Sequence, residues 1–201
     1  MKKKTRNILF GVLALEVLVL LVLIVVLVIL PQINSVNQTD IVNFPDSELE
    51  VVIRNALEKP TGDIYGADLI GLTSLECIGY RIVNLEGIQH CVNLTNLTLM
   101  ANGIVDISPL SDLTKLEKLY LNGNEIVDIS PLSGLTNLTI LDLDYNEIVD
   151  IQPLVDNAGL GAEDEVQLRH NNLYLTPVSL DMLNIEALER RGVRVYYDSQ
   201  N

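Results

Sequence analysis

Apolar and polar residues repeat along this chain with a period of 22 residues, and the repeat predicts most of its structure. Two complete copies read LTNLTLMANGIVDISPLSDLTK (94–115) and LEKLYLNGNEIVDISPLSGLTN (116–137), and LTILDLDYNEIVDIQPL (138–154) begins a third. Residues 75–94 follow the same frame with substitutions, and VQLRHNNL (166–173) repeats it three residues late. A fixed period of this length is typical of solenoids, in which each coil buries its apolar side against its neighbours.

Each copy predicts a strand followed by a turn. In the phrase LxLxxN the leucines alternate, as they do in a strand with one buried face. The asparagine that follows can donate to and accept from backbone groups of adjacent coils, because those groups have no other partner in the interior. This slot holds Asn102, Asn124, Asn146 and Asn171, with Tyr80 in its place in the first copy.

The second half of each copy predicts a return segment across the other face. Its aspartates can cap backbone amides in the turn, and its prolines fix the backbone where no ladder of hydrogen bonds is needed. These residues are Asp106, Asp128 and Asp150, and Pro109, Pro131 and Pro153.

Both ends of the array carry patterns that predict caps. Asp46 can N-cap a helix over residues 47–58, whose apolar positions fall on one face; they are Leu49, Val52, Ile53, Ala56 and Leu57. At the other end we expect a helix from Leu180 to Arg191, ended by Gly192 and followed by a strand at 193–197.

The pattern LxxLxLxxNxIxDIxPLxxLTxL, over roughly residues 45–201, closely resembles the bacterial internalin-like class of leucine-rich repeats. This resemblance implies an α/β solenoid with a parallel sheet on its concave side and short helical turns on its convex side. It also implies that proteins bind across the sheet. On this reading residues 45–71 form a helical N-terminal cap, residues 72–161 the repeats, and residues 162–201 a C-terminal cap of helix and strand.

The segment before the repeats predicts a membrane anchor. Residues 8–30 are apolar except for Gly11 and Glu16, and as a helix they would extend about 35 Å, enough to cross a hydrocarbon core of about 30 Å. The basic tail at 1–7 favours a cytoplasmic N-terminus, which leaves residues 31–44 as a tether and the repeats outside a plasma membrane crossed once. A cleaved signal peptide is the alternative, although no small-residue cleavage site follows. Glu16 is either a helix-association residue or a tolerated one.

Charge narrows the choice of partner. Residues 1–30 carry +3, so the remaining 171 residues must carry −17 to give the net charge of −14. Such an acidic surface repels nucleic acid, and it favours either a basic ligand or simple solubility.

The sequence offers no motif for catalysis or for a cofactor. Neither His90 nor His170 completes a triad or a metal-ligand set, so we expect a binding protein and not an enzyme. Cys77 and Cys91 take leucine slots and should point inward, as a disulfide or as two buried thiols. Asp142 and Asp144 share one side of a strand and predict a calcium site or a solvated acidic patch.

The candidate binding site is the concave face, because the resemblance implies protein binding there. Four exposed apolar side chains are expected to cluster diagonally on it as an anchor for a protein or peptide ligand. Tyrosine and arginine are favoured in such sites. The expected binding residues are Met100, Tyr120, Ile140, Asp142, Asp144, Tyr145 and Arg169. The hypothesis is a cell-surface recognition module; the alternatives are a structural envelope component and an accessory docking subunit of a membrane complex.

Overall fold

The structure is a computed structural model that describes residues 40–198. Its elements in chain order are α3 (Ser47–Ala56), α4 (Gly66–Leu69), β1 (Ser74–Glu76), η2 (Ile88–His90), β2 (Asn96–Thr98), η3 (Ser108–Leu110), β3 (Lys118–Tyr120), η4 (Ser130–Gly134), β4 (Ile140–Asp142), α5 (Gln152–Asp156), β5 (Glu165–Gln167), α6 (Leu180–Arg190) and β6 (Arg194–Tyr196).

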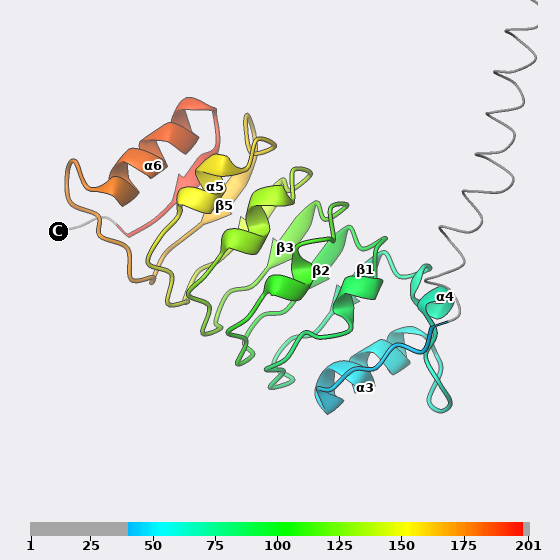
Figure 1. The fold of residues 1–201 in the computed structure, drawn as a ribbon. Helices are drawn as coiled ribbons and strands as arrows, with labels where there is room; N and C mark the ends of the chain where they lie inside the picture. The colour runs from blue at the N-terminus through cyan, green and yellow to red at the C-terminus, as the bar shows by residue number, and fades with distance from the viewer. Residues whose placement is uncertain (1–39, 199–201) are drawn as a thin grey trace, which may run out of the picture. The chain divides into compact units, whose positions relative to one another are not determined.

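The strands form one parallel six-stranded sheet whose order is the order of the chain, β1 to β6 (Figure 1). The register advances by one repeat from strand to strand, so Leu97 pairs with Leu119 and Leu119 with Leu141. The central residues of β1 to β5 are buried while their neighbours face outward, as the alternation of leucines predicts.

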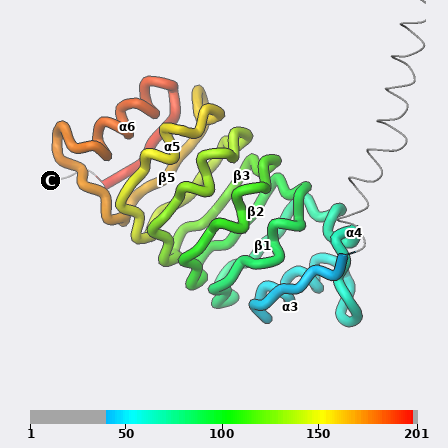
Figure 2. The backbone as a smooth tube through the Cα atoms, in the orientation of Figure 1, coloured from blue at the N-terminus to red at the C-terminus, as the bar shows by residue number. Residues whose placement is uncertain are grey.

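Short helical turns form the layer opposite the sheet within residues 41–198. η2, η3, η4 and α5 succeed one another across this layer, and the backbone winds between the two layers as a series of coils (Figure 2). The leucines and isoleucines of the repeat fill the space between the layers, and almost all of them are fully buried. The predicted leucine-rich-repeat solenoid is therefore confirmed for this part of the chain.

The asparagines form the predicted ladder between coils. Asn124 accepts a hydrogen bond from the Ile104 amide at 3.1 Å. Its side-chain amide donates to the carbonyls of Leu99 at 3.0 Å and Leu121 at 2.8 Å. Asn102, Asn146 and Asn171 repeat this arrangement. Each asparagine thus satisfies buried backbone groups of its own coil and of the preceding coil.

The aspartates of the return segment cap the turns as predicted. The Asp106, Asp128 and Asp150 carboxylates each accept a hydrogen bond of 2.8 Å from the amide two residues on. In the first coil Asn84 performs the same role for the Glu86 amide.

One carboxylate joins the N-terminal cap to the first coil. One oxygen of Asp46 accepts from the Glu48 and Leu49 amides and so N-caps α3, as predicted. The other oxygen accepts from the Val83 and Asn84 amides of the first coil, at 2.8 and 3.1 Å. α3 ends at Ala56, two residues earlier than expected, with Ala56 itself exposed.

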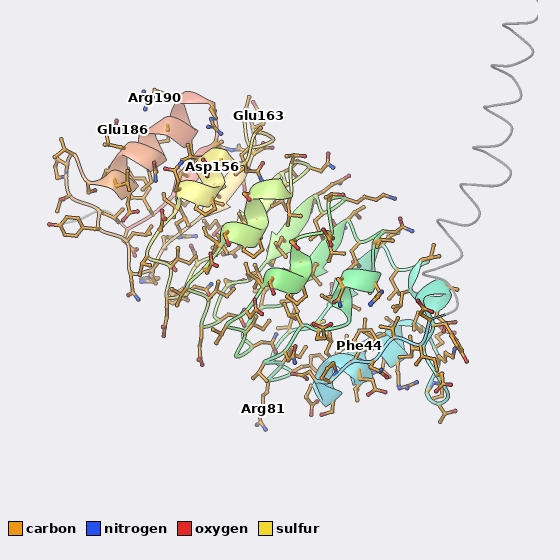
Figure 3. The ribbon with its side chains drawn as sticks, in the orientation of Figure 1. Phe44, Arg81, Asp156, Glu163, Glu186 and Arg190 are labelled. Atoms are coloured by element: carbon orange, nitrogen blue, oxygen red, sulfur yellow. The ribbon has the colours of Figure 1, made fainter. Side chains whose placement is uncertain are left out.

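The expected tether of residues 31–44 includes, at its carboxyl end, residues that belong to the folded domain. Ile41 forms an antiparallel bridge with Tyr65, while Val42 and Phe44 are each 6% exposed and belong to the core. Phe44, labelled beside α3 in Figure 3, packs on the first coil at Gly87, where a Cβ atom would lie 2.6 Å from its ring. Val42 and Phe44 are two residues apart in an extended segment, so both face the core while Ile41, Asn43 and Pro45 face outward.

The C-terminal cap has the predicted helix and strand. Ser179 N-caps α6, and β6 adds in parallel to β5. The delay of three residues in the last coil arises from a segment that the repeat does not predict. There Asn157 is fully buried, and its amide donates to the carbonyls of Leu132 and Leu135 in the previous coil.

Residues 1–39 and 199–201 lie outside the described part of the chain. The predicted basic tail at 1–7, the anchor at 8–30 and most of the tether therefore lie there too. Between residues 40 and 198, no helix combines the length and apolarity needed to cross a bilayer.

Candidate functional site

Three rows of side chains run across the concave face, perpendicular to the strands. The register defines two of them. The first row is Ser74, Asn96, Lys118, Ile140, Glu165 and Arg194, and the second is Glu76, Thr98, Tyr120, Asp142, Gln167 and Tyr196. The strand-end residues Ile78, Met100, Asn122, Asp144, Arg169 and Asp198 continue the same alternation as a third row.

The predicted apolar patch separates into two parts. Met100, Tyr120 and Ile140 stand on consecutive strands, each one row further back than the last, and all three are partly exposed. Neighbours on such a diagonal have Cα atoms about 8 Å apart, within reach of long side chains. Tyr145 stands beyond the strand end, in the turn, so the expected four-residue cluster is a diagonal of three with Tyr145 apart from it.

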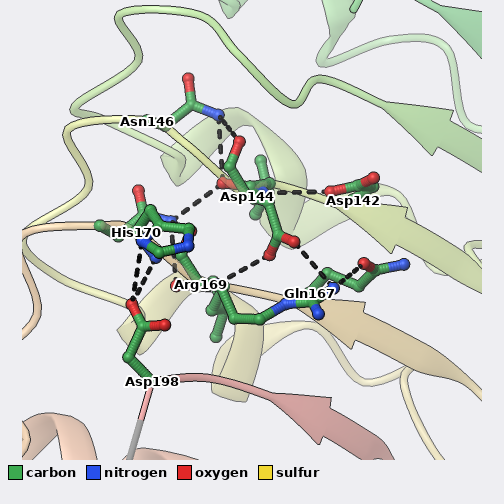
Figure 4. A network of polar contacts seen from close by, with 10 residues as sticks. Asp142, Asp144, Asn146, Gln167, Arg169, His170 and Asp198 are labelled. Carbon is green, nitrogen blue, oxygen red and sulfur yellow. Dashed lines mark hydrogen bonds and ion pairs between the residues drawn. The ribbon is translucent and has the colours of Figure 1, made fainter.

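Asp144 is not the exposed acid that the alternation predicts, since it is only 7% exposed. One of its carboxylate oxygens accepts from the Arg169 amide at 2.7 Å, and the other lies 2.8 Å from the Arg169 guanidinium (Figure 4). Asp144 therefore holds both the backbone and the side chain of Arg169. The sequence could not show this pairing because the two residues are 25 positions apart across the delayed coil.

The Asp142 carboxylate lies in the row next to Asp144 and is not part of the ion pair with Arg169. Burial raises its pKa above the usual range for an aspartate, and the neighbouring Asp144 charge adds to this. The Asp144 amide, which donates to Asp142 at 3.1 Å, and the Arg169 charge act in the opposite direction but do not outweigh burial. With Asp144 paired to Arg169, the two aspartates form neither a free acidic patch nor a cage of cation ligands.

Arg169 and Tyr145 belong to a polar network at the far end of the sheet. The guanidinium of Arg169 also contacts Gln167 and lies 5.9 Å from the centre of the Tyr196 ring. Tyr145 is 59% exposed and stacks on His170, with the ring centroids 4.2 Å apart. The His170 amide donates to Asp198 at 2.6 Å.

Tyr196 and Asp198 were not among the predicted site residues. The signal for them was present, because the predicted strand at 193–197 extends the sheet and its alternate residues continue the concave rows. In the sequence, His170 completes neither a catalytic triad nor a metal-ligand set, but it follows Arg169 as Tyr145 follows Asp144. The stacking of Tyr145 on His170 follows from that equivalence of positions.

Two buried cysteines, Cys77 and Cys91, are free thiols, and burial raises the pKa of each to about 12, which suppresses the reactive thiolate. In residues 40–198 no group of three or more histidine, cysteine, aspartate or glutamate side chains is arranged to hold a metal ion. What the concave face offers is an apolar diagonal with acidic and basic side chains around it.

A family model described as "Leucine Rich repeats (2 copies)" matches residues 114–156. These residues are leucine-rich repeats. A comparison with curated proteins finds no match to the chain.

Several solved structures are similar to the chain. An internalin, InlF, of Listeria monocytogenes is 24% identical, with a TM-score of 0.49, over 79% of this chain and 58% of that one. Internalin C2 of the same species is 24% identical over 77% of this chain and 94% of that one, with a TM-score of 0.37. The functional domain of InlJ, also from Listeria monocytogenes, is 24% identical over 71% and 41%, with a TM-score of 0.40. The chain thus spans little more than half of the InlF structure.

Proposed function

We propose that this protein is an internalin-like recognition module that binds a protein or peptide on the concave face of its leucine-rich repeats. The observation that carries the proposal is the diagonal of Met100, Tyr120 and Ile140. It is a set of partly exposed apolar side chains on a rigid sheet, with no described element covering it. Exposed apolar groups held on a regular surface are typical anchors for a protein ligand.

Electrostatics favours a basic ligand. Residues 31–201 carry a net charge of −17, and the partly buried Asp142 lies beside Tyr120 in the same row. A ligand with an apolar side chain for the diagonal and a lysine or arginine for Asp142 would be complementary to this surface. Six strands about 4.8 Å apart give a face of only about 25 Å, so the ligand is a peptide, a loop or one small domain.

Presentation at the cell surface is part of the proposal. The apolar segment 8–30 would anchor the chain, and the basic residues before it would keep the N-terminus in the cytoplasm. The repeats would then face outward close to their own membrane. An enzymatic role is not proposed, since the concave face provides contacts and no reactive group.

The decisive experiment measures ligand capture by the full chain in membranes. Tyr120→Ala should reduce capture at least tenfold, since it removes the central member of the diagonal. The thermal midpoint should stay the same, because the side chain is only partly buried. Tyr174→Ala is the matched control, as this tyrosine is 68% exposed and belongs to none of the three concave rows. Equal capture by a folded Tyr120→Ala protein would refute binding at the diagonal.

Tyr145→Ala tests the second part of the predicted patch by itself. If the ligand extends to the stacked Tyr145 and His170, this variant should also weaken capture. If only the diagonal contributes, capture should be unchanged.

The alternative is a structural envelope component or a docking subunit that associates through its membrane segment. Glu16 within that segment motivates this alternative. Crosslinking in membranes with Glu16→Leu separates the two. Loss of crosslinked assemblies in this variant, with no loss in variants of the concave face, would favour the structural role.

A further inference from the structure

A second surface with a regular pattern runs along the flank of the solenoid, where the chain leaves the strand and turns back. We call it the valine flank: Val83, Val105, Val127 and Val149, one residue from each of four successive coils. These side chains are 62, 53, 40 and 53% exposed, respectively. Tyr174, 68% exposed, takes the equivalent slot in the delayed fifth coil.

The fold needs an apolar residue beside each of these valines but not at the valine itself. Ile104 and Ile107, on either side of Val105, are fully buried, so they supply the core contacts of this turn. The backbone here is held by hydrogen bonds between coils, such as that from the Glu125 amide to the Ile104 carbonyl at 3.0 Å. The valines are therefore held in line at the coil spacing, about 4.8 Å.

Acidic residues border Val127 and Val149 on both sides and Val105 on one side. Glu125 and Glu147 precede Val127 and Val149 by two residues, and both glutamates are exposed. Asp106, Asp128 and Asp150 directly follow the valines and are also exposed. The three turns 103–106, 125–128 and 147–150 contain no lysine or arginine. A basic residue in this series is Arg81 of the first coil, labelled at the edge of the molecule in Figure 3.

We propose that the valine flank is a docking site for a basic amphipathic helix of another protein. The apolar row is bordered by acidic residues on both sides of Val127 and Val149 and on one side of Val105. It is therefore complementary to a helix with one apolar stripe and lysine or arginine beside that stripe. Four valines span about 14 Å. Three turns of helix rise about 16 Å and match this span, whereas the same-face residues of a strand would extend about 20 Å over three steps.

The other occupants fit less well. A second copy placed flank to flank would bring two acidic surfaces together, and an anionic membrane surface would be repelled in the same way. The flank and the concave face lie on different sides of each coil, so this site goes beyond the ligand proposed for the diagonal.

The test uses the full chain in nanodiscs of neutral lipid and a fluorescent four-turn peptide. The peptide carries leucines along one stripe and lysines on both sides of it. One control peptide has the same composition with the leucines scattered around the helix, and another has glutamates in place of the lysines. We expect saturable binding of the first peptide alone, measured by anisotropy against empty nanodiscs.

Substitutions then locate the site. The triple variant Val105→Thr, Val127→Thr and Val149→Thr keeps the side-chain shape and should weaken binding at least tenfold. Its matched control, Val51→Thr, Val92→Thr and Val178→Thr, changes three exposed valines elsewhere and should bind as the unaltered protein does. Glu125→Gln with Glu147→Gln should weaken binding about threefold at low salt, and Glu186→Gln with Glu189→Gln on α6 should not.

Four outcomes would overturn the proposal. The first is unchanged binding by the valine triple variant, and the second is equal binding of the scattered peptide. The third is self-association of the chain that the valine triple variant abolishes, which would make a second copy the occupant. Tyr120→Ala should bind the peptide normally. Loss of binding in that variant would show that the peptide binds the concave face and would reject the flank site. It would not test the ligand proposed for the diagonal.

Discussion

The regular coils between residues 94 and 154 and the irregular coils at either side of them satisfy their buried backbone groups in different ways. A regular coil depends on its neighbours: its asparagine bonds backward to the preceding coil, and the next asparagine bonds to it. The first and last coils each have a regular neighbour on one side only. Residues from outside the repeat take over there, and these residues are the ones that the pattern does not predict.

The first coil shows why a repeat position can change. Its asparagine slot holds Tyr80, which is 39% exposed, because no earlier coil offers carbonyls to an asparagine there. The outward-facing amides of Val83 and Asn84 bond to Asp46 of the cap. The departure from the pattern is therefore a consequence of position in the array.

The last coil shows a tighter solution. Gly159 approaches the backbone of Thr136 so closely that a Cβ atom would lie 1.9 Å from the Thr136 carbonyl oxygen. Asn157 bonds to the preceding coil, and its carbonyl accepts from the Arg191 guanidinium of the C-terminal cap. The inserted segment thus joins the regular array to α6.

The largest effect should come from Gly159→Ala. The added methyl group has no space without a backbone shift, so we expect the free energy of unfolding to fall by at least about 3 kcal/mol. Gly134→Ala is the control, because a Cβ atom there meets nothing within 4 Å. Urea unfolding measures both. If Gly159→Ala is as stable as Gly134→Ala, the close approach is not a real constraint.

Next in size is the loss of an asparagine from a regular coil. Asn124→Ala removes the partners of Ile104, Leu99 and Leu121 and should cost about 3 kcal/mol, since buried backbone groups are left unsatisfied.

Asn122→Ala is a control from the same coil. The Asn122 side-chain oxygen lacks a hydrogen-bond partner among the described residues, so its loss should change stability by less than about 0.5 kcal/mol. Equal effects of the two substitutions on urea unfolding would contradict the ladder.

These contrasts also explain what the sequence could predict. The strands, the asparagine ladder and the aspartate caps follow from a local pattern that recurs every 22 residues, and the two terminal helices follow from their own capping and apolar patterns. The burial of Asp144 does not, because it depends on Arg169 in a coil displaced by the insertion. The sequence pattern also predicts Tyr145 in one patch with Ile140, but Tyr145 lies beyond the end of β4, in the turn.

The core role of Asn157 was beyond a pattern-based prediction. A single asparagine in an irregular segment is normally a turn residue, and only the fold brings it beneath Leu132 and Leu135. Tyr196 is predictable from the sequence, because it is an outward-facing residue of the strand expected at 193–197.

A smaller effect is expected at the N-terminal junction. Asp46→Ala should cost about 2 kcal/mol, because the change removes the cap of α3 and the partners of two amides of the first coil. Urea unfolding should show this loss at pH 7.

The same junction should make stability depend on acid pH. Burial alone would raise the pKa of Asp46, but its four amide donors outweigh burial and hold the pKa below the usual range. The carboxylate therefore contributes stability above the unfolded-state pKa, and that contribution is lost as pH falls through the folded-state pKa. Asp46→Ala should flatten this acid limb, and Asp112→Asn, at an exposed aspartate, should not. An unchanged acid limb in Asp46→Ala would assign it to other carboxylates.

The smallest expected effect on stability comes from the two cysteines, which distinguish the first coil from the others. Cys77 takes the slot that Leu99 and Leu121 fill in later coils, and with Cys91 it gives this coil two buried thiols. Because burial raises the pKa of both thiols to about 12, the unfolded chain releases these protons first as pH rises above 9. The free energy of unfolding should then fall by about 1 kcal/mol for each thiol between pH 8 and pH 10. The double variant Cys77→Ala and Cys91→Ala should lose this part of the pH dependence of stability. Iodoacetamide should label neither thiol in the native protein at pH 8, and both after unfolding. Rapid native labelling would show that the first coil opens more readily than the regular coils beside it.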